Sequence, residues 1–65
     1  MELTVNGEAT TSTAATVLEL LRSLELDPAR VAIELNLAIL PKAAYATTPL
    51  KSGDRLEIVH FVGGG

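Results

Sequence analysis

The fold depends on residues 16–24, which read Thr16-Val17-Leu18-Glu19-Leu20-Leu21-Arg22-Ser23-Leu24. A threonine with a glutamate three residues later is a capping box. The Thr16 hydroxyl can accept a hydrogen bond from the Glu19 amide, and the Glu19 carboxylate can accept one from the Thr16 amide. The apolar residues recur at helical spacing, at Val17, Leu20, Leu21 and Leu24. The stretch therefore predicts a short amphipathic helix, which Asp27-Pro28 ends.

The segment before this helix alternates apolar and polar residues with a period of two, as half-buried strands do. Residues 2–6 predict a first strand, and Asn6-Gly7 predicts a tight hairpin turn because both positions require positive φ. Residues 8–11 return as a short edge strand with few apolar side chains. The chain therefore starts as a β-hairpin.

The segment after the helix predicts three more strands. Residues 31–35 alternate, residues 37–40 form a second apolar run, and the two could pair as an antiparallel ribbon around Asn36. Residues 42–49 are irregular, with Tyr45 as the expected anchor into the domain. A turn at Gly53 leads into residues 56–62, the most β-prone stretch of the chain.

One amphipathic helix can cover only one face of a sheet, so five strands and one helix predict a two-layer α+β domain. A hairpin, a crossover helix and a last strand placed beside the first correspond to the ubiquitin-like β-grasp arrangement. Its first and last strands are parallel neighbours at the centre of a mixed sheet, which explains the apolar character of residues 56–62. We expect a β-grasp domain over residues 1–60 and a flexible glycine tail over residues 61–65.

The composition argues against several classes of function. The 65 residues contain no cysteine, which removes disulfides, thiolate nucleophiles and cysteine metal sites. The net charge of −3 and the scattered lysines and arginines argue against a nucleic-acid partner. No apolar run approaches the roughly 20 residues that span a bilayer, and no signal peptide is visible. We expect a cytoplasmic protein that does not bind membranes.

The residues needed for catalysis by the chain alone are missing from the sequence. His60 is the single histidine, and the carboxylates show no metal-ligand spacing. A nucleophile needs a base within hydrogen-bond reach, yet the three serines are expected on loops or on the helix surface. We therefore expect no catalytic residue, no bound metal and no cofactor.

The uncovered face of the sheet is the candidate partner-binding surface. Glu34 and Glu57 are expected on adjacent strands of this face, where they form part of an acidic docking surface or a merely solvated one. Val59 and Phe61 share the parity of Glu57, so this face also carries apolar groups, unless Phe61 folds into the core. With Val62, these residues are the expected binding surface.

The glycine tail Phe61-Val62-Gly63-Gly64-Gly65 is the candidate reactive segment. Either this tail has a function, or it is a frayed chain end or a remnant of protein expression. A chain without Cβ atoms can enter a narrow channel in another protein, and five extended residues reach about 16 Å. If the tail is functional, Gly63 and Gly64 are the narrow segment inserted into a partner's active site, and Gly65 presents its carboxylate there.

The whole chain resembles the ThiS family, the small β-grasp sulfur carriers of thiamine biosynthesis. The resemblance rests on five segments of the sequence: Val5-Asn6-Gly7-Glu8, Thr16-Val17-Leu18-Glu19-Leu20-Leu21, Val31-Ala32-Ile33-Glu34-Leu35-Asn36, Gly53-Asp54-Arg55-Leu56-Glu57-Ile58 and Phe61-Val62-Gly63-Gly64-Gly65. One departure is Asn36-Leu37, where family members commonly have a glycine beside the asparagine. We expect a shifted turn there, with Leu37 or Leu40 exposed.

The resemblance implies a definite chemistry at Gly65. An E1-like adenylyltransferase of the ThiF type would use ATP and magnesium to adenylate the Gly65 carboxylate. Sulfur from a donor such as a cysteine desulfurase would then displace AMP, and the resulting thiocarboxylate would supply a ThiG-type thiazole synthase. ATP and magnesium belong to the activating enzyme, so this chain would be a carrier and not an enzyme.

Three alternatives remain open. The same fold and chemistry would serve a carrier for molybdopterin, cysteine or methionine synthesis. A ubiquitin-like modifier would instead be joined to lysines through its C-terminus. A plain interaction module would use its sheet face, and its glycines would have no role.

Overall fold

The computed structural model describes residues 1–61, which form strands, an α-helix and two 3₁₀ helices around one core. In chain order the elements are β1 (Glu2–Val5), β2 (Glu8–Thr11), α1 (Val17–Ser23), η1 (Pro28–Arg30), β3 (Val31–Leu35), β4 (Ala38–Leu40), η2 (Lys42–Ala44) and β5 (Arg55–His60). The division into a domain over residues 1–60 and a tail over residues 61–65 stays a prediction, because residues 62–65 lie outside the described part.

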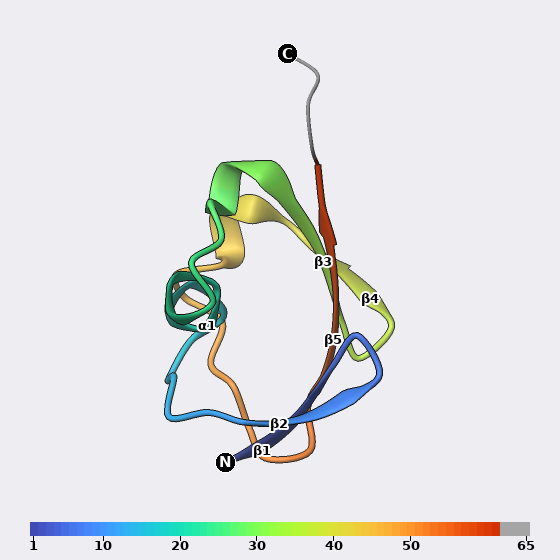
Figure 1. Ribbon diagram of the computed structural model, residues 1–65. Helices are drawn as coiled ribbons and strands as arrows, with labels where there is room; N and C mark the ends of the chain where they lie inside the picture. The colour runs from blue at the N-terminus through green and yellow to red at the C-terminus, as the bar shows by residue number, and fades with distance from the viewer. Residues whose placement is uncertain (62–65) are drawn as a thin grey trace.

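The five strands form one sheet in the order β2-β1-β5-β3-β4. β5 lies at its centre, parallel to β1 and antiparallel to β3. β2 and β4 are antiparallel edge strands. Helix α1 lies on one side of the sheet and leaves the other side uncovered (Figure 1). The predicted ubiquitin-like β-grasp fold, with its first and last strands as parallel neighbours, is confirmed.

The apolar side of α1 packs into the core as its spacing predicts. Val17, Leu20 and Leu21 are fully buried against the sheet residues Ile33 and Leu56. Excluding these side chains from water is the main stabilising contribution available to so small a domain. The fourth predicted member, Leu24, is instead 42% exposed. It is the C-cap of the helix and lies beyond the last regular turn, so the apolar spacing in the sequence extends past the buried side of the helix.

Both ends of α1 differ in detail from the sequence prediction. The Thr16 hydroxyl accepts from the Glu19 amide at 3.2 Å, as expected. The Glu19 carboxylate, however, accepts from the Ala15 amide at 3.4 Å rather than from the Thr16 amide. The helix ends in a Schellman motif, because the Leu26 amide reaches the Leu21 carbonyl at 2.9 Å with Glu25 at φ 60°. The chain therefore leaves the helix before Pro28.

Two asparagines bind the hairpin turns to β5. Asn6 and Asn36 both have positive φ, and their backbone amides donate to carbonyls of β5 at 2.9 and 2.8 Å. The Asn6 side chain accepts from the Ile58 amide and donates to the Ile58 carbonyl. The Asn36 side chain accepts from the Arg55 amide and donates to the carboxylate of Asp54. Each side chain thus extends the hydrogen bonding of β5 past the end of a neighbouring strand.

The turn between β3 and β4 keeps the tight two-residue form, so the predicted shift is wrong. Leu35 pairs with Ala38, which leaves Asn36 and Leu37 as the turn. Leu37 has a φ of 71°, in the left-handed region that disfavours residues with a Cβ atom. Its side chain is 80% exposed, whereas Leu40 packs against the core. Of the two leucines of which one was expected to be exposed, Leu37 is therefore the exposed one.

Smaller differences concern the ends of elements. β1 ends at Val5 and β5 runs from Arg55 to His60, so β5 begins and ends earlier than predicted. Residues 42–49 include the 3₁₀ helix η2, and Tyr45 is buried there as the expected anchor. None of the helices within residues 1–61 is long and apolar enough to cross a membrane.

Replacing Leu37 with glycine should stabilise the protein. Leu37→Gly removes the steric conflict of a left-handed leucine, and the gain exceeds the extra chain entropy that glycine brings to the unfolded state. We expect the free energy of unfolding to rise by about 0.5–1 kcal/mol in urea denaturation. Leu37→Ala is the matched control, because it shortens the same side chain but keeps the Cβ atom. Equal stability of the two variants would contradict the strain argument.

Candidate docking face and the start of the tail

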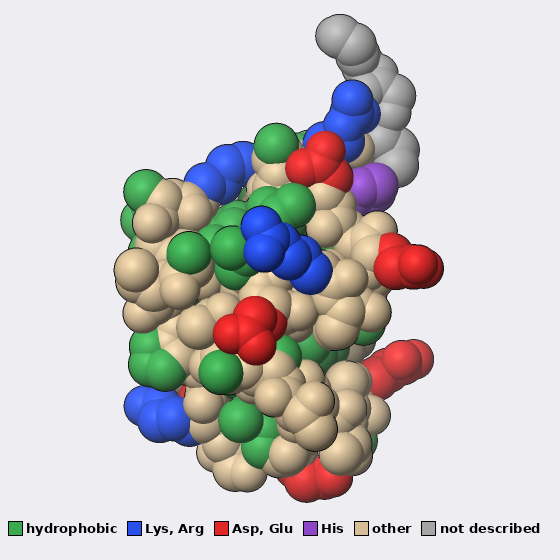
Figure 2. Space-filling view, turned by 90° about the vertical axis from the view of Figure 1, so that its left-hand side faces the viewer, with side chains coloured by type: hydrophobic (Ala, Val, Ile, Leu, Met, Phe, Trp, Pro, Cys, Tyr) green, Lys and Arg blue, Asp and Glu red, His purple; other side chains and the backbone are tan. Residues whose placement is uncertain are grey.

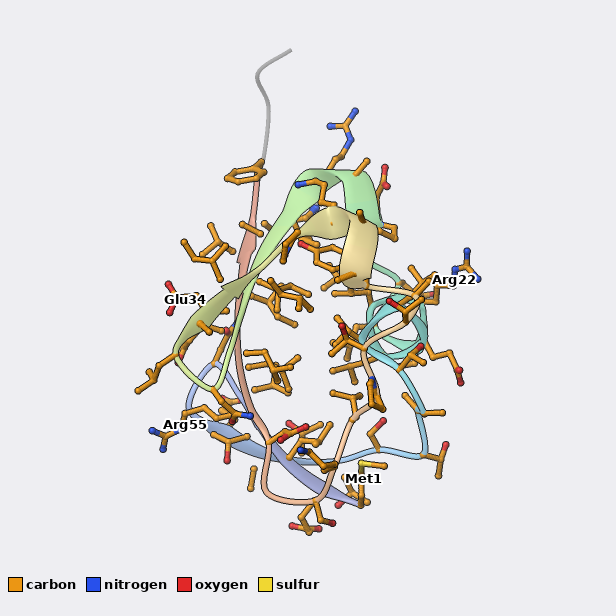
Figure 3. The ribbon with its side chains drawn as sticks, turned by 180° about the vertical axis from the view of Figure 1, so that it is seen from behind. Met1, Arg22, Glu34 and Arg55 are labelled. Carbon is orange, nitrogen blue, oxygen red and sulfur yellow. The ribbon has the colours of Figure 1, made fainter. Side chains whose placement is uncertain are left out.

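The side of the sheet opposite α1, here called the open face, carries an apolar groove. Figure 3 shows Glu34 and Arg55 on this side, pointing away from the helix, with Arg22 beyond the helix. The groove is lined by Ala32, Ile33, Glu34, Ile39, Glu57 and Val59, which come from β3, β4 and β5. The open face is therefore a shaped surface on three adjacent strands.

Large apolar side chains lie exposed on this groove. Ile39 is 82% exposed and Val59 is 56% exposed. Single exposed apolar residues are common on protein surfaces, but a group of them around one depression marks an interaction site. Strand alternation in the sequence predicted Val59 on this face but not Ile39. The two-residue turn at Asn36-Leu37 places Ile39 directly opposite Glu34, so the hairpin register was the signal that could have found it.

Glu34 and Glu57 lie directly opposite each other on β3 and β5. Both are exposed, and like charges in this cross-strand position destabilise a sheet. Within residues 1–61 the one ion pair joins Arg30 to Asp27, at 3.7 Å, so neither glutamate has a cationic partner there. The structure thus brings the two predicted carboxylates together, and a cation from another molecule would reduce the repulsion between them.

Phe61 is the last described residue and is 52% exposed, so its alternative placement in the core is wrong. Its amide donates to the Arg30 carbonyl at 2.8 Å, one residue after β5 ends at His60. His60 is exposed and lies opposite Val31. The roles expected for Val62, Gly63, Gly64 and Gly65 fall outside the described residues.

The helix side of the molecule has a second apolar hollow, lined by Leu18, Pro28, Ala29, Lys42, Tyr45 and Ala46. Figure 2 shows hydrophobic side chains on this side with lysine and arginine side chains around them. The Tyr45 hydroxyl donates to the Val31 carbonyl at 3.2 Å. Burial raises the pKa of the Tyr45 phenol above its ordinary value of 10.0, and a backbone hydrogen bond from Ile33 opposes that rise in part. Tyr45 is therefore a neutral hydrogen-bond donor at physiological pH.

The described part of the chain offers no arrangement of side chains for metal binding. Residues 1–61 contain no group of three His, Cys, Asp or Glu side chains placed to hold an ion. The open face instead combines exposed apolar groups with two unpaired carboxylates. Such a surface suits the docking of a protein with a basic side chain among apolar ones.

Comparison with known proteins identifies the kind of protein this chain is similar to. A model of the ThiS family matches residues 2–65. A thiazole synthase of Paramagnetospirillum magneticum is 47% identical over 66 aligned residues, which cover all of this chain and 20% of that protein. The sulfur carrier protein ThiS of Bacillus subtilis is 44% identical over 50 residues, covering 77% of this chain and 76% of its own. This chain thus spans about a fifth of that thiazole synthase and most of that carrier.

A solved structure shares the whole fold. The crystal structure of a thiamine biosynthesis protein (ThiS) from Geobacter metallireducens superposes with a TM-score of 0.82 at 40% identity. The match covers all of both chains. The likeness therefore extends from sequence to three-dimensional structure.

The opposed glutamates should measurably destabilise the sheet. Glu57→Gln removes one of two like charges, so we expect the free energy of unfolding to rise by about 0.2–1 kcal/mol at low ionic strength. Added salt should reduce this gain by screening the repulsion. Glu8→Gln, on β2, changes the net charge equally and serves as the control. The same gain in both variants would show a general charge effect and not a local one.

Proposed function

This chain belongs to the ThiS family, and from that membership we propose that it is a sulfur carrier for the thiazole ring of thiamine. The observation that carries the proposal is the family match over residues 2–65, which includes the glycine tail as well as the domain. The identity to a named sulfur carrier and the shared fold of a ThiS structure support it.

The proposed reactive group is the carboxylate of Gly65. A carboxylate is a poor electrophile, so an E1-like adenylyltransferase of the ThiF type first converts it with ATP to an acyl-adenylate and releases pyrophosphate. The outer sulfur of a persulfide donor, such as a cysteine desulfurase, attacks the adenylate and displaces AMP, which gives an acyl disulfide between carrier and donor. A second thiol, such as free cysteine, then attacks the donor's sulfur, forms a disulfide with it and releases the carrier as a thiocarboxylate. ATP and magnesium are bound by the activating enzyme. We place these steps in the cytoplasm, where ATP is available.

In this proposal the folded domain is the part of the carrier that the partner enzyme binds. The exposed Ile39 and Val59 give the activating enzyme an apolar surface, and the carboxylates of Glu34 and Glu57 accept a basic side chain between them. Phe61 and Val62 are proposed to extend this surface toward the glycines, and Gly63 and Gly64 to pass through the channel to the partner's active site. The chain itself then needs no catalytic side chain.

A thiazole synthase is the proposed recipient of the sulfur. In Paramagnetospirillum magneticum, a segment 47% identical to this chain is part of a protein named thiazole synthase that is about five times as long. A carrier segment within such a protein meets the synthase at a high effective concentration. This joining favours thiazole formation over the other sulfur-carrier pathways.

Intact-mass measurement tests the proposal. The 65-residue chain is incubated with a ThiF-type enzyme, ATP, magnesium and a cysteine desulfurase with cysteine. We expect the mass gain of one oxygen replaced by sulfur, located at the C-terminal residue by fragmentation. Deleting Gly65 should abolish the gain and leave the free energy of unfolding unchanged, because the core lies within residues 3–56.

The other outcomes identify the alternatives. Conjugates on lysine would indicate a ubiquitin-like modifier. An unmodified chain, in a system that loads the Bacillus subtilis carrier, would contradict both carrier and modifier. A loaded chain that supports no thiazole formation with a thiazole synthase would assign the carrier to another pathway.

The open face should determine how well the activating enzyme binds the carrier. Ile39→Ser removes the most exposed large apolar side chain of the groove, so we expect KM for the carrier in adenylate formation to rise about tenfold or more. The value of kcat should stay near that of the wild type. Leu24→Ser, which alters an exposed leucine on the helix side, is the matched control. Equal KM values for Ile39→Ser and the wild type would exclude the groove from the interface.

A further inference from the structure

Lys42 lies at the end of the molecule from which β5 leads into the tail. η1, η2 and the end of β5 gather there (Figure 1, green, yellow and red). The Nζ atom of Lys42 is 3.0 Å from the Val31 carbonyl oxygen and 5.8 Å from the centroid of the Phe61 ring. Lys42 therefore connects the start of β3 with Phe61, the first residue of the tail.

The Val31 carbonyl holds the Lys42 ammonium in place. The Arg30 carbonyl faces β5, where it accepts from the Phe61 amide, so strand alternation directs the Val31 carbonyl to the β4 side. β4 ends at Leu40, opposite Ile33, and offers no backbone partner at this position. Lys42 and Tyr45 donate to this carbonyl in its place, at 3.0 and 3.2 Å. The hydrogen bond to Val31 thus fixes the position of the ammonium group beside the Phe61 ring.

The Phe61 ring gains an electrostatic attraction from this anchored cation. A lysine ammonium within about 6 Å of an aromatic centroid is attracted to the ring face. Phe61 is half exposed and has no place in the core, so packing alone does not hold its side chain. The hydrogen bond from the Phe61 amide to the Arg30 carbonyl restrains its backbone, and Lys42 restrains its ring.

We propose that Lys42 is a positioning residue of the carrier, which holds Phe61 against the domain through its ring and so fixes the point from which the tail starts. The proposal rests on the proposed function, because a fixed starting point matters when the tail must enter a partner's active site. Ordering a residue before binding lowers the entropy lost on binding. A lysine that acts through Phe61 should therefore affect how tightly the carrier binds rather than the chemical step.

The kinetic test uses the 65-residue chain with a ThiF-type enzyme and measures adenylate formation. Lys42→Met keeps an unbranched apolar side chain but removes the charge, and we expect KM for the carrier to rise about three- to tenfold with kcat unchanged. Lys42→Arg keeps a cation and should restore KM to within about twofold of the wild type. Lys51→Met removes a charge near the start of β5 and should leave KM unchanged.

A double-mutant cycle separates positioning from a merely structural role. If Lys42 acts through the ring, Lys42→Met should raise KM no further in a Phe61→Leu background. If it only satisfies the Val31 carbonyl, the two substitutions should contribute independently, and that result would overturn the proposal. A loss of kcat in Lys42→Met with KM unchanged would also overturn it.

Amide hydrogen exchange gives a test that needs no enzyme. In Lys42→Met, the Phe61 amide should exchange several-fold faster than in the wild type, whereas the Ile33 amide of the core should keep its rate. An unchanged Phe61 rate would overturn the proposal. If the wild-type chain is not adenylated at all, the proposed function fails, and the Phe61 amide alone decides whether Lys42 positions this residue.

Discussion

The hydrogen bonding of β5 on both of its edges is the constraint on which the rest of the structure depends. β1 and β3 flank this strand, although about 50 residues separate β1 from β5 in sequence. The pairing of β5 with β1 is short, and the Asn6 side chain lengthens it, whereas the Asn36 side chain binds β5 beyond the end of β3. The buried carboxylate of Asp54 adds bonds to the Asn36 amide and to the Lys51 backbone amide. β5 thus joins the two hairpins into the one sheet that α1 covers.

The same arrangement accounts for the surface on which the proposed function relies. One helix covers one face of five strands, so the side chains of Ile39 and Val59 face solvent on the other. The central strand leads directly into the tail, which places Phe61 next to the ends of β3 and η2. A short β4 leaves the Val31 carbonyl to Lys42 and Tyr45. The folded domain and the start of the tail are therefore parts of one hydrogen-bonded unit.

Much of the candidate site could be predicted because strand parity is a local property. The alternation along β5 is enough to place Glu57 and Val59 on one side of the strand, and the alternation along β3 does the same for Glu34. Ile39 could not be placed in this way because its side depends on the register of the β3–β4 turn. Lys42 was missed for a different reason: its contacts with Val31 and Phe61 join residues 11 and 19 positions away, and no periodic pattern reports them.

The amino-acid sequence by itself determined the elements whose causes are local. These are the Thr16 cap, the apolar spacing of α1, the Asn6-Gly7 turn and the alternating strands, and each follows from neighbours within a few residues. Only the tertiary structure decided where those elements end and which partners complete them. Asn36 and Leu37 adopt left-handed conformations because β3 and β4 must pair in register. The Glu19 carboxylate accepts a hydrogen bond from the Ala15 amide, and Leu24 faces solvent. Both follow from the path of the chain into and out of α1, and that path depends on contacts between distant segments.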